Sequence, residues 1–206
     1  MYNNLKGKKI VFFGDSITDT CKSFNKEYPY GSGYVSIIRG DLHSENKFSD
    51  IEIFNEGISG NKTEDLLARI DSVISINPDI VFLLIGVNDI WHPFEEGLKL
   101  NYNSIIDRIS TIIEILSKNS KVVVLTPFLF PTDEFFLSLK PHFDNFMKIY
   151  LSYLNSHSIE YIDTNSILNN LVKTVGALGV VKDSVHPTML GHGAIAQAIL
   201  DYLKDK

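Results

Sequence analysis

Short apolar runs alternate with longer segments of helical periodicity along nearly the whole chain, and this alternation restricts the fold more than any other feature. The apolar runs are rich in Ile, Val, Phe and Leu and are bounded by turn residues, which predicts buried strands at residues 9–13, 51–54, 80–85, 121–125 and 159–162. Strands that are apolar on both faces are typical of a parallel sheet with helices packed on each side. We therefore expect an α/β fold with a central parallel sheet of about five strands.

The segments between these runs predict the covering helices. Apolar residues at helical spacing indicate helices at about 33–42, 62–76 and 101–117, and a last helix that follows Pro187 and extends to Leu203. The segment 133–156 is expected to be helical only in part, because Pro141 should break or restart it. The sequence contains no repeat, low-complexity stretch or linker, so residues 1–206 are predicted to form a single domain.

Composition excludes several classes of partner. The net charge of −6, with both signs scattered, argues against a nucleic-acid-binding protein, which would need a concentrated basic face. The single cysteine, Cys21, cannot form an internal disulfide or a zinc site and is expected to have a packing or surface role. No apolar stretch is long enough to span a bilayer, and residues 1–9 precede too short an apolar run for a signal peptide. A cytoplasmic protein without a membrane span is the expectation.

Polar motifs follow the predicted strands at the ends where ligands bind in open parallel sheets. Gly14-Asp15-Ser16 follows the first strand, residues 55–61 follow the second, and Gly86-Val87-Asn88-Asp89 follows the third, while Asp183-Ser184-Val185-His186-Pro187 precedes the last helix. Taken singly, each motif could be a helix cap or a turn. Their joint occurrence at one edge of one predicted sheet favours a functional site.

The two outermost motifs hold the three chemical parts of a nucleophilic hydrolase. Ser16 supplies a hydroxyl group, and Asp183 stands three residues before His186, so that both side chains can project from one turn. A histidine can remove the serine proton as a general base, and an aspartate can orient the imidazole. The pattern predicts an enzyme, a nucleophilic hydrolase, if the fold brings both ends of the chain together.

These motifs resemble the SGNH family of GDSL-type esterases and lipases, named for the serine, glycine, asparagine and histidine of four sequence blocks. Ser16, Gly60, Asn88 and the Asp183/His186 pair match those blocks, with Gly57 as an alternative to Gly60, and the similarity extends over residues 9–200. The resemblance implies a flavodoxin-like three-layer α/β/α sandwich. It also implies an oxyanion hole formed by the backbone N–H groups of Ser16 and Gly60 and the side-chain amide of Asn88, with no metal or organic cofactor.

Further strings resemble one branch of the family, the carbohydrate acetylesterases that include acetylxylan esterases. The strings are residues 85–91, 126–128 and 186–192. On this basis Trp91 is a candidate for stacking on a sugar face or, alternatively, a packing residue. Tyr28, Tyr30 and Phe128 are weaker candidates for the pocket wall. Asp15 is the remaining candidate, and we expect it to brace the loop beside Ser16.

Three hypotheses about function remain open at this point. The first is an esterase for small acyl groups, most simply acetyl groups on sugars or short oligosaccharides. The second is a lysophospholipase or thioesterase for longer acyl chains, with an apolar groove lined by Phe135, Phe136, Leu137 and Leu139. The third is a non-catalytic module that binds a small molecule on the same fold. The segment 126–140 could serve as a lid, an acyl groove or a contact in a homo-oligomer.

Overall fold

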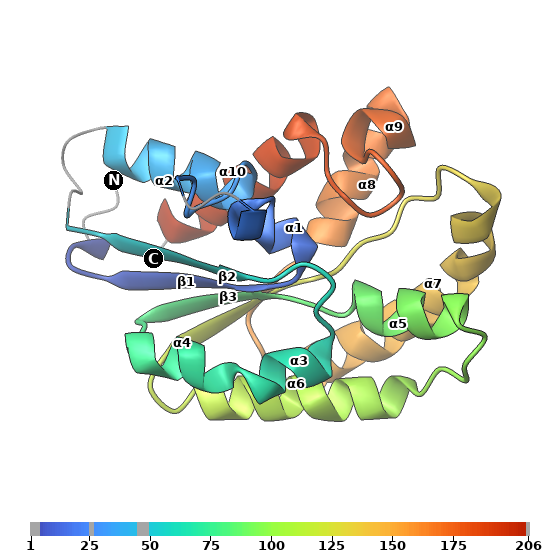
Figure 1. The fold of residues 1–206 in the computed structure, drawn as a ribbon, viewed down its shortest axis with the longest axis horizontal. Coiled ribbons are helices and arrows are strands. Elements are labelled where there is room, and N and C mark those ends of the chain that lie inside the picture. The colour runs from blue at the N-terminus through green and yellow to red at the C-terminus, as the bar shows by residue number, and fades with distance from the viewer. Residues whose placement is uncertain (1–4, 25–26, 45–49, 205–206) are drawn as a thin grey trace.

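Five parallel strands form a central sheet in the structure, a computed structural model that describes residues 5–24, 27–44 and 50–204 (Figure 1). The strands are β1 (Lys9–Gly14), β2 (Glu52–Gly57), β3 (Ile80–Leu84), β4 (Lys121–Leu125) and β5 (Tyr161–Ile162). All neighbouring pairs are parallel, as the alternation predicts. β5 is shorter than the predicted run 159–162, because only two of its residues pair with β4.

The strand order is β2-β1-β3-β4-β5. The chain leaves β1 towards β2 on one side and then returns across β1 to place β3, β4 and β5 on the other side. This order is that of flavodoxin-like folds, and it creates a crevice between the loops that follow β1 and β3. Ser16 follows β1 and Asn88 follows β3, so the fold places both residues at this crevice.

The register brings the ends of the strands to one level. Gly14, the last residue of β1, lies opposite Gly57 of β2 and Leu84 of β3, and Leu84 lies opposite Leu125 of β4. Because the strands are parallel, the segments that follow these four residues emerge along the same edge. The polar motifs therefore meet at that edge although they are far apart in sequence.

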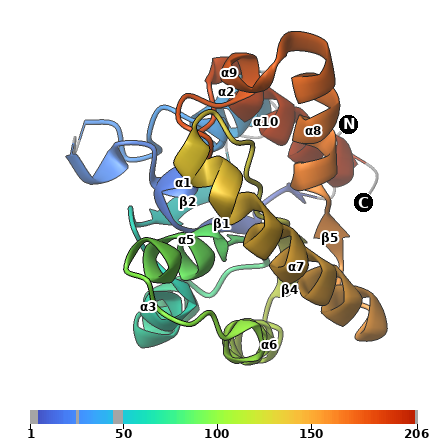
Figure 2. The same ribbon diagram turned by 90° about the vertical axis from the view of Figure 1, so that its right-hand side faces the viewer.

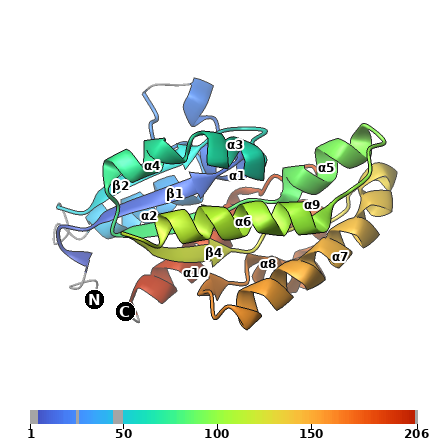
Figure 3. The same ribbon diagram turned by 90° about the horizontal axis from the view of Figure 1, so that it is seen from below.

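Helices cover both faces of the sheet and complete a three-layer sandwich (Figures 1 and 2). One face carries α2 (Tyr34–Ser44), α8 (Thr164–Val175) and α10 (Met189–Lys204). The other carries α3 (Thr63–Ala68), α4 (Ile70–Ile76), α6 (Tyr102–Leu116) and α7 (Glu134–Ser156), with α6 between α3 and α7 (Figure 3). Short elements lie beyond the strand ends: α1 (Ser16–Asp19), the 3₁₀ helix η2 (Lys22–Phe24), α5 (Val87–Glu95) and α9 (Ala177–Val180).

The core forms because the central strands are apolar on both faces. Residues 10–13 of β1 and 81–84 of β3 are fully buried, and the ring of Phe12 stacks on that of Phe82 with 5.3 Å between centroids. Burial of a large apolar side chain stabilises the folded state by about 1.5–3 kcal/mol. The two strands that lead to the Ser16 and Asn88 segments are thus anchored in the core.

Helix α7 differs from the prediction at Pro141. The helix runs without interruption from Glu134 to Ser156, although the proline was expected to break or restart it. Pro141 is exposed, so the Leu137 carbonyl that loses its intrahelical partner lies on the solvent side. Buried Phe136 and Leu139 before the proline and Phe143 after it anchor both halves against the protein, which holds the helix together.

The predicted helix 62–76 is divided into α3 and α4 at Arg69. This residue has φ −118° and ψ 18°, which lies outside the helical region. Its side chain turns towards the sheet and binds the ends of β1 and β2. The helices α1, α5, α8 and α9 were not predicted. Helices α1 and α9 have only four residues each, whereas α5 and α8 carry an amphipathic period that the sequence analysis did not use. Among the described residues, none of the helices has the length and apolar character to cross a bilayer.

Candidate active site

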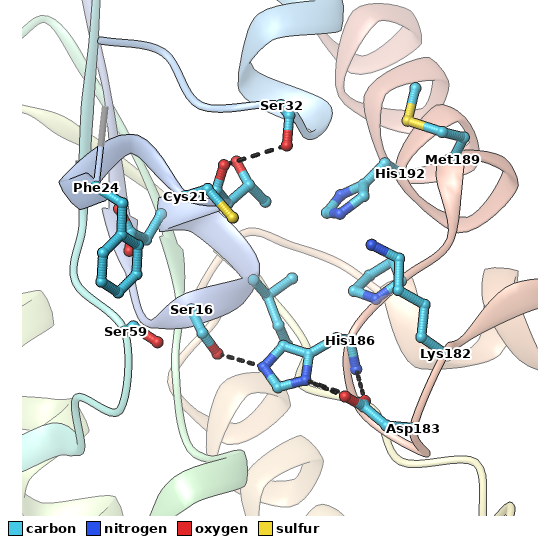
Figure 4. A pocket seen from close by; sticks show the side chains of 14 residues that line it. Ser16, Cys21, Phe24, Ser32, Ser59, Lys182, Asp183, His186, Met189 and His192 are labelled. Atoms are coloured by element: carbon cyan, nitrogen blue, oxygen red, sulfur yellow. Dashed lines mark hydrogen bonds and ion pairs between the residues drawn. The ribbon is translucent and has the colours of Figure 1, made fainter. Parts of the chain in front are cut away.

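Ser16, His186 and Asp183 form a continuous hydrogen-bonded chain at the carboxyl edge of the sheet (Figure 4). The Ser16 Oγ atom lies 2.9 Å from Nε2 of His186. On the other side of the ring, Nδ1 lies 2.8 Å from Oδ2 and 3.0 Å from Oδ1 of Asp183. A carboxylate beside Nδ1 keeps the proton on that nitrogen, so Nε2 is free to accept the serine proton. This is the geometry of an activated nucleophile.

Helix α1 presents Ser16 at its first position. Asp15 is the N-cap, and its Oδ1 accepts a hydrogen bond of 2.9 Å from the backbone N–H of Ile17. The side chain of Asp15 is almost completely buried and does not line the cavity beside Ser16. Asp15 is thus placed to brace the turn, and its burial leaves it unable to contact a substrate directly.

A short turn before α10 presents Asp183 and His186. Asp183 Oδ1 accepts the backbone N–H of His186 at 2.9 Å, which closes the turn. Between them Ser184 has φ +76°, a conformation that is rare for a residue with a side chain. Its Oγ accepts the backbone N–H of Thr132 at 2.9 Å, and its carbonyl accepts that of Phe130 at 2.9 Å. These bonds tie the turn to the segment after β4.

Electrostatics keep Asp183 ionised. Partial burial opposes ionisation, but the hydrogen bonds from the backbone and the ring of His186 outweigh it, so that the pKa of Asp183 lies below its ordinary value. The carboxylate is half-exposed, with 54% of its side-chain surface accessible. It can therefore stabilise an imidazolium at His186 without being buried itself.

Gly60 and Asn88 lie in the segments that follow β2 and β3, at the sheet edge that also carries Ser16. Asn88 is buried in the first turn of α5, and one N–H of its amide donates to the carbonyl of Asn61 at 3.0 Å, which leaves its second N–H for another acceptor. The backbone N–H groups of Ser16 and Gly60 donate no hydrogen bond to any part of the chain that the structure describes. Three donors without acceptors are thus provided by the three loops.

The structure separates the roles of Gly57 and Gly60. A Cβ atom on Gly57 would lie 2.2 Å from the backbone nitrogen of Asp19, so this glycine is required where β2 packs on α1. Gly60 has φ +80°, and no heavy atom of the described residues lies within 4 Å of the position that a Cβ atom on it would take. Gly57 therefore has a packing role, while Gly60 lies in open space with a backbone conformation that suits glycine.

A cavity of about 370 Å³ opens beside Ser16 and His186. Its wall comes from the loop after α1 and from the start of α10, as Figure 4 shows. Besides Ser16, His186 and Asp183, the residues that line it include Cys21, Phe24, Ser32, Ser59, Lys182, Met189 and His192. None of these seven was selected as a wall residue from the sequence. Ser59, Met189 and His192 lie in motif segments, but a motif does not show which of its side chains face a cavity, and only the tertiary contacts bring the seven together.

His192 forms the buried part of this wall. Its ring is stacked on Tyr34 with centroids 6.3 Å apart. Burial and the charge of nearby Lys182 lower the pKa of His192 to about 4. The ring is therefore neutral at pH 7, and this environment agrees with a packing role.

The predicted wall residues lie elsewhere. Phe128 is fully buried and packs against Phe130, because the segment after β4 turns inward beneath the Ser184 turn. Tyr30 packs under the guanidinium of Arg39 at 4.3 Å and borders a separate surface recess. Tyr28 is exposed and does not line the catalytic cavity.

Trp91 contacts the His186 ring but does not line the cavity beside Ser16. Its ring centroid lies 6.5 Å from that of His186 and 4.9 Å from that of Phe136. The indole therefore packs against the catalytic imidazole, and it is not among the residues that line the cavity. Its position favours the packing alternative over stacking on a sugar.

The four residues suggested for an apolar acyl groove do not form one. Phe136 and Leu139 are buried against the protein, Phe135 is half-buried, and Leu137 is exposed on the outer side of α7. None of them lines the catalytic cavity. Buried packing also removes Phe128 and Phe130 from any exposed lid or subunit contact.

Within the described ranges, no group of three or more His, Cys, Asp or Glu side chains is arranged to hold a metal ion.

Comparison with known proteins gives a consistent picture. Residues 12–194 match the model of the GDSL-like Lipase/Acylhydrolase family. An acetylxylan esterase from Geobacillus stearothermophilus is 29% identical over 205 residues, covering 94% of this chain and 93% of that protein. The solved structure of a catalytic mutant of an acetylxylan esterase from the same organism has a TM-score of 0.83 and 27% identity, covering 96% of this chain and 94% of that one. A putative GDSL-like lipase from Parabacteroides merdae has a TM-score of 0.86 and 27% identity, with 98% and 97% covered.

Proposed function

The chain belongs to the GDSL-like lipase/acylhydrolase family and is a carboxylic ester hydrolase, and we propose that it removes acetyl groups from short acetylated oligosaccharides through an acyl-enzyme on Ser16. The observation that carries this proposal is the hydrogen-bonded chain from Ser16 through His186 to Asp183, which opens directly into the cavity. Similarity to an acetylxylan esterase over 94% of the chain supports the acetyl and carbohydrate parts of it.

In the first half of the reaction, Ser16 Oγ attacks the ester carbonyl while Nε2 of His186 takes its proton. The imidazolium is stabilised by Asp183 and then protonates the alcohol that leaves. The tetrahedral oxyanion accepts hydrogen bonds from the N–H groups of Ser16 and Gly60 and from the free N–H of Asn88. Such preorganised donors act where charge develops in the transition state. In the second half, His186 activates a water molecule that hydrolyses the acetyl-enzyme.

The cavity favours a small acyl group over a long one. Its volume of about 370 Å³ is at the lower end of the range of ligand sites. Its wall mixes hydroxyl, amino and imidazole groups with Phe24 and Met189, a composition that can bind the polar alcohol part of a sugar ester. The residues that would extend an apolar acyl groove lie outside it, which gives the lysophospholipase hypothesis no support from the geometry.

Hydrolysis of a chain-length series tests the proposal. p-Nitrophenyl esters from acetyl to octanoyl are assayed beside an acetylated xylo-oligosaccharide, with wild type, Ser16→Ala and the control Ser36→Ala, whose serine is exposed on α2. We expect a preference for acetyl, release of acetate from the oligosaccharide and loss of turnover only in Ser16→Ala. Rates that rise from acetyl to octanoyl would show that the enzyme prefers long acyl chains and would overturn the proposed substrate. Wild-type rates in Ser16→Ala would overturn the proposed mechanism.

A further inference from the structure

Arg69 stands between α3 and α4, where its backbone leaves the helical conformation and its side chain turns under the site. Only 17% of the side-chain surface is exposed. The guanidinium carbon lies 4.7 Å from the centroid of the Phe13 ring, which holds it from one side. Burial lowers the pKa of Arg69 from an ordinary value so high that the group stays charged at any working pH. A positively charged guanidinium is thus held in a fixed position at the ends of β1 and β2.

This guanidinium joins the two strands that lead to the nucleophile and to the glycine loop. Its Nη2 donates to the carbonyl of Gly14, the last residue of β1, and to that of Glu56 in β2, both at 3.0 Å. Gly14 is two residues before Ser16, and Glu56 is four residues before Gly60. The Arg69 side chain therefore adds a link between these two loops to the backbone pairing of β1 with β2.

The same guanidinium is linked to the third donor, Asn88, through Asn61 of the glycine loop. Its Nε donates to Oδ1 of Asn61 at 2.7 Å, and the carbonyl of Asn61 accepts the side-chain amide of Asn88 at 3.0 Å. Asn61 directly follows Gly60, so this residue couples the glycine loop to Asn88. One continuous hydrogen-bond path thus connects all three segments that supply the oxyanion donors.

We propose that Arg69 is the positioning residue of the oxyanion hole: it fixes the loops of Ser16, Gly60 and Asn88 relative to one another without contacting the substrate. The proposal rests on the serine esterase function proposed above. A planar group with several donors in fixed directions suits three acceptors that converge from the ends of β1 and β2 and from the glycine loop, whereas the single ammonium of lysine cannot satisfy all of them. The motif analysis did not select Arg69, since it lies outside the four blocks.

The expected effect is specific to the transition state. Displaced donors bind the ground-state carbonyl as weakly as before but stabilise the oxyanion less, so kcat and kcat/KM should fall together while KM changes little. Loss of one complete oxyanion donor lowers kcat by roughly 10²–10³. Because the donors are displaced and not removed, we expect a fall of roughly 10–100-fold for Arg69→Met.

The experiment measures kcat, KM and Tm on p-nitrophenyl acetate for wild type, Arg69→Met, Arg69→Lys and Asn61→Ala. The matched control is Arg39→Met, because Arg39 also lies over an aromatic ring but is remote from the catalytic chain. A double variant of Arg69→Met with Asn61→Ala completes a thermodynamic cycle. We expect a lowered kcat with nearly unchanged KM in each site variant, no change in the control, and a double variant less impaired than the product of the single effects.

Each outcome decides the matter. A folded Arg69→Met enzyme with wild-type kcat, or one in which KM alone rises, would overturn the inference. If Arg69→Met does not fold, Asn61→Ala and Arg69→Lys still test it, since wild-type kcat in both would contradict a positioning role. Ser16→Ala is assayed on the same ester: residual turnover in that variant overturns the proposed function itself, whereas its inactivity combined with an unaffected Arg69 variant overturns only the role of Arg69.

Discussion

Asp15 is a buried carboxyl group that directly precedes Ser16, the proposed nucleophile, in the sequence. Its Oδ1 accepts the Ile17 N–H, and its Oδ2 is buried with no hydrogen-bond partner among the described residues. Burial raises the pKa of Asp15 from 3.8 to about 7, and the charge of Asp89 adds to this effect. An unpaired buried oxygen is tolerated more easily when the group is neutral. The protonation of Asp15 is therefore coupled to the stability of the fold.

The sign of this coupling predicts a pH dependence. Since the pKa of Asp15 is higher in the folded state than in the unfolded state, its contribution to stability is lost as pH rises from about 4 to about 7. In Asp15→Asn the side chain cannot ionise, so the loss of stability that comes from Asp15 does not occur. We expect the Tm of wild type relative to Asp15→Asn to fall between pH 5 and pH 8, measured by thermal unfolding. His192, whose lowered pKa acts with the opposite sign, is present in both proteins and cancels in the difference. Parallel Tm curves would contradict the assignment.

Asn88 provides a second test at the scale of the residue. Asn88→Ala removes one proposed oxyanion donor while Asp89, which holds the same turn through Thr63 and Arg108, remains in place. We expect kcat to fall by roughly 10²–10³ with little change in KM, measured on p-nitrophenyl acetate. Asn103→Ala, at an exposed position of α6, is the control. An unchanged kcat would remove Asn88 from the oxyanion hole.

At the scale of the elements, the contact between β2 and α1 sets the distance between the glycine loop and the nucleophile. Asn55 of β2 donates to the carbonyl of Thr18 in α1 at 2.8 Å and to that of Tyr30 at 2.9 Å. Its Oδ1 accepts the N–H of Gly57, which lies against the backbone of Asp19. No side chain fits between the two elements at this point.

Two glycine substitutions should therefore affect different properties of the protein: Gly57→Ala its stability, and Gly60→Ala its activity. Gly57→Ala places a methyl group against the backbone of α1 and should strongly lower the Tm or prevent folding. Gly60→Ala meets no neighbouring atom, and its positive φ costs about 1–2 kcal/mol. We expect Gly60→Ala to fold and to lose activity, as measured by Tm and kcat. A wild-type Tm for Gly57→Ala would show that α1 and β2 can separate without loss of stability.

At the scale of the whole molecule, the site depends on the folding of both ends of the chain. Ser16 and His186 are 170 positions apart in sequence, yet their side chains are hydrogen-bonded. The sheet and both helix layers share one continuous hydrophobic core from Leu5 to Leu203. A single core of this kind is expected to unfold cooperatively.

We therefore predict that esterase activity and secondary structure are lost in the same urea transition. The measurement compares residual activity with far-UV circular dichroism at matched urea concentrations after equilibration. The control is near-UV dichroism or fluorescence of Trp91, whose ring contacts that of His186. Activity lost at clearly lower urea than both optical signals would show that the Asp183–His186 turn detaches before the core unfolds.

Much of this architecture could be predicted from the sequence. The apolar period identifies all five strands, and the requirement that such strands be buried on both faces indicates a parallel sheet. Strand ends in a parallel sheet lie at one edge, which places the motifs of Ser16, Asn88 and His186 together. The prediction at Pro141 was wrong because a proline breaks a helix only where its freed carbonyl lacks another partner and packing does not hold both halves.

Sequence alone determined the sheet, the edge at which the polar loops gather and the candidates for nucleophile, base and acid, because these follow from periodicity along the chain and from the chemistry of single side chains. Only the tertiary structure decided what surrounds them. Phe128 turned inward, Trp91 packed on His186, and Arg69, between α3 and α4, bound the ends of β1 and β2 and the loop of Gly60. Periodicity shows which face a side chain occupies, but the group opposite that face comes from a distant part of the chain, and only folding brings the two together.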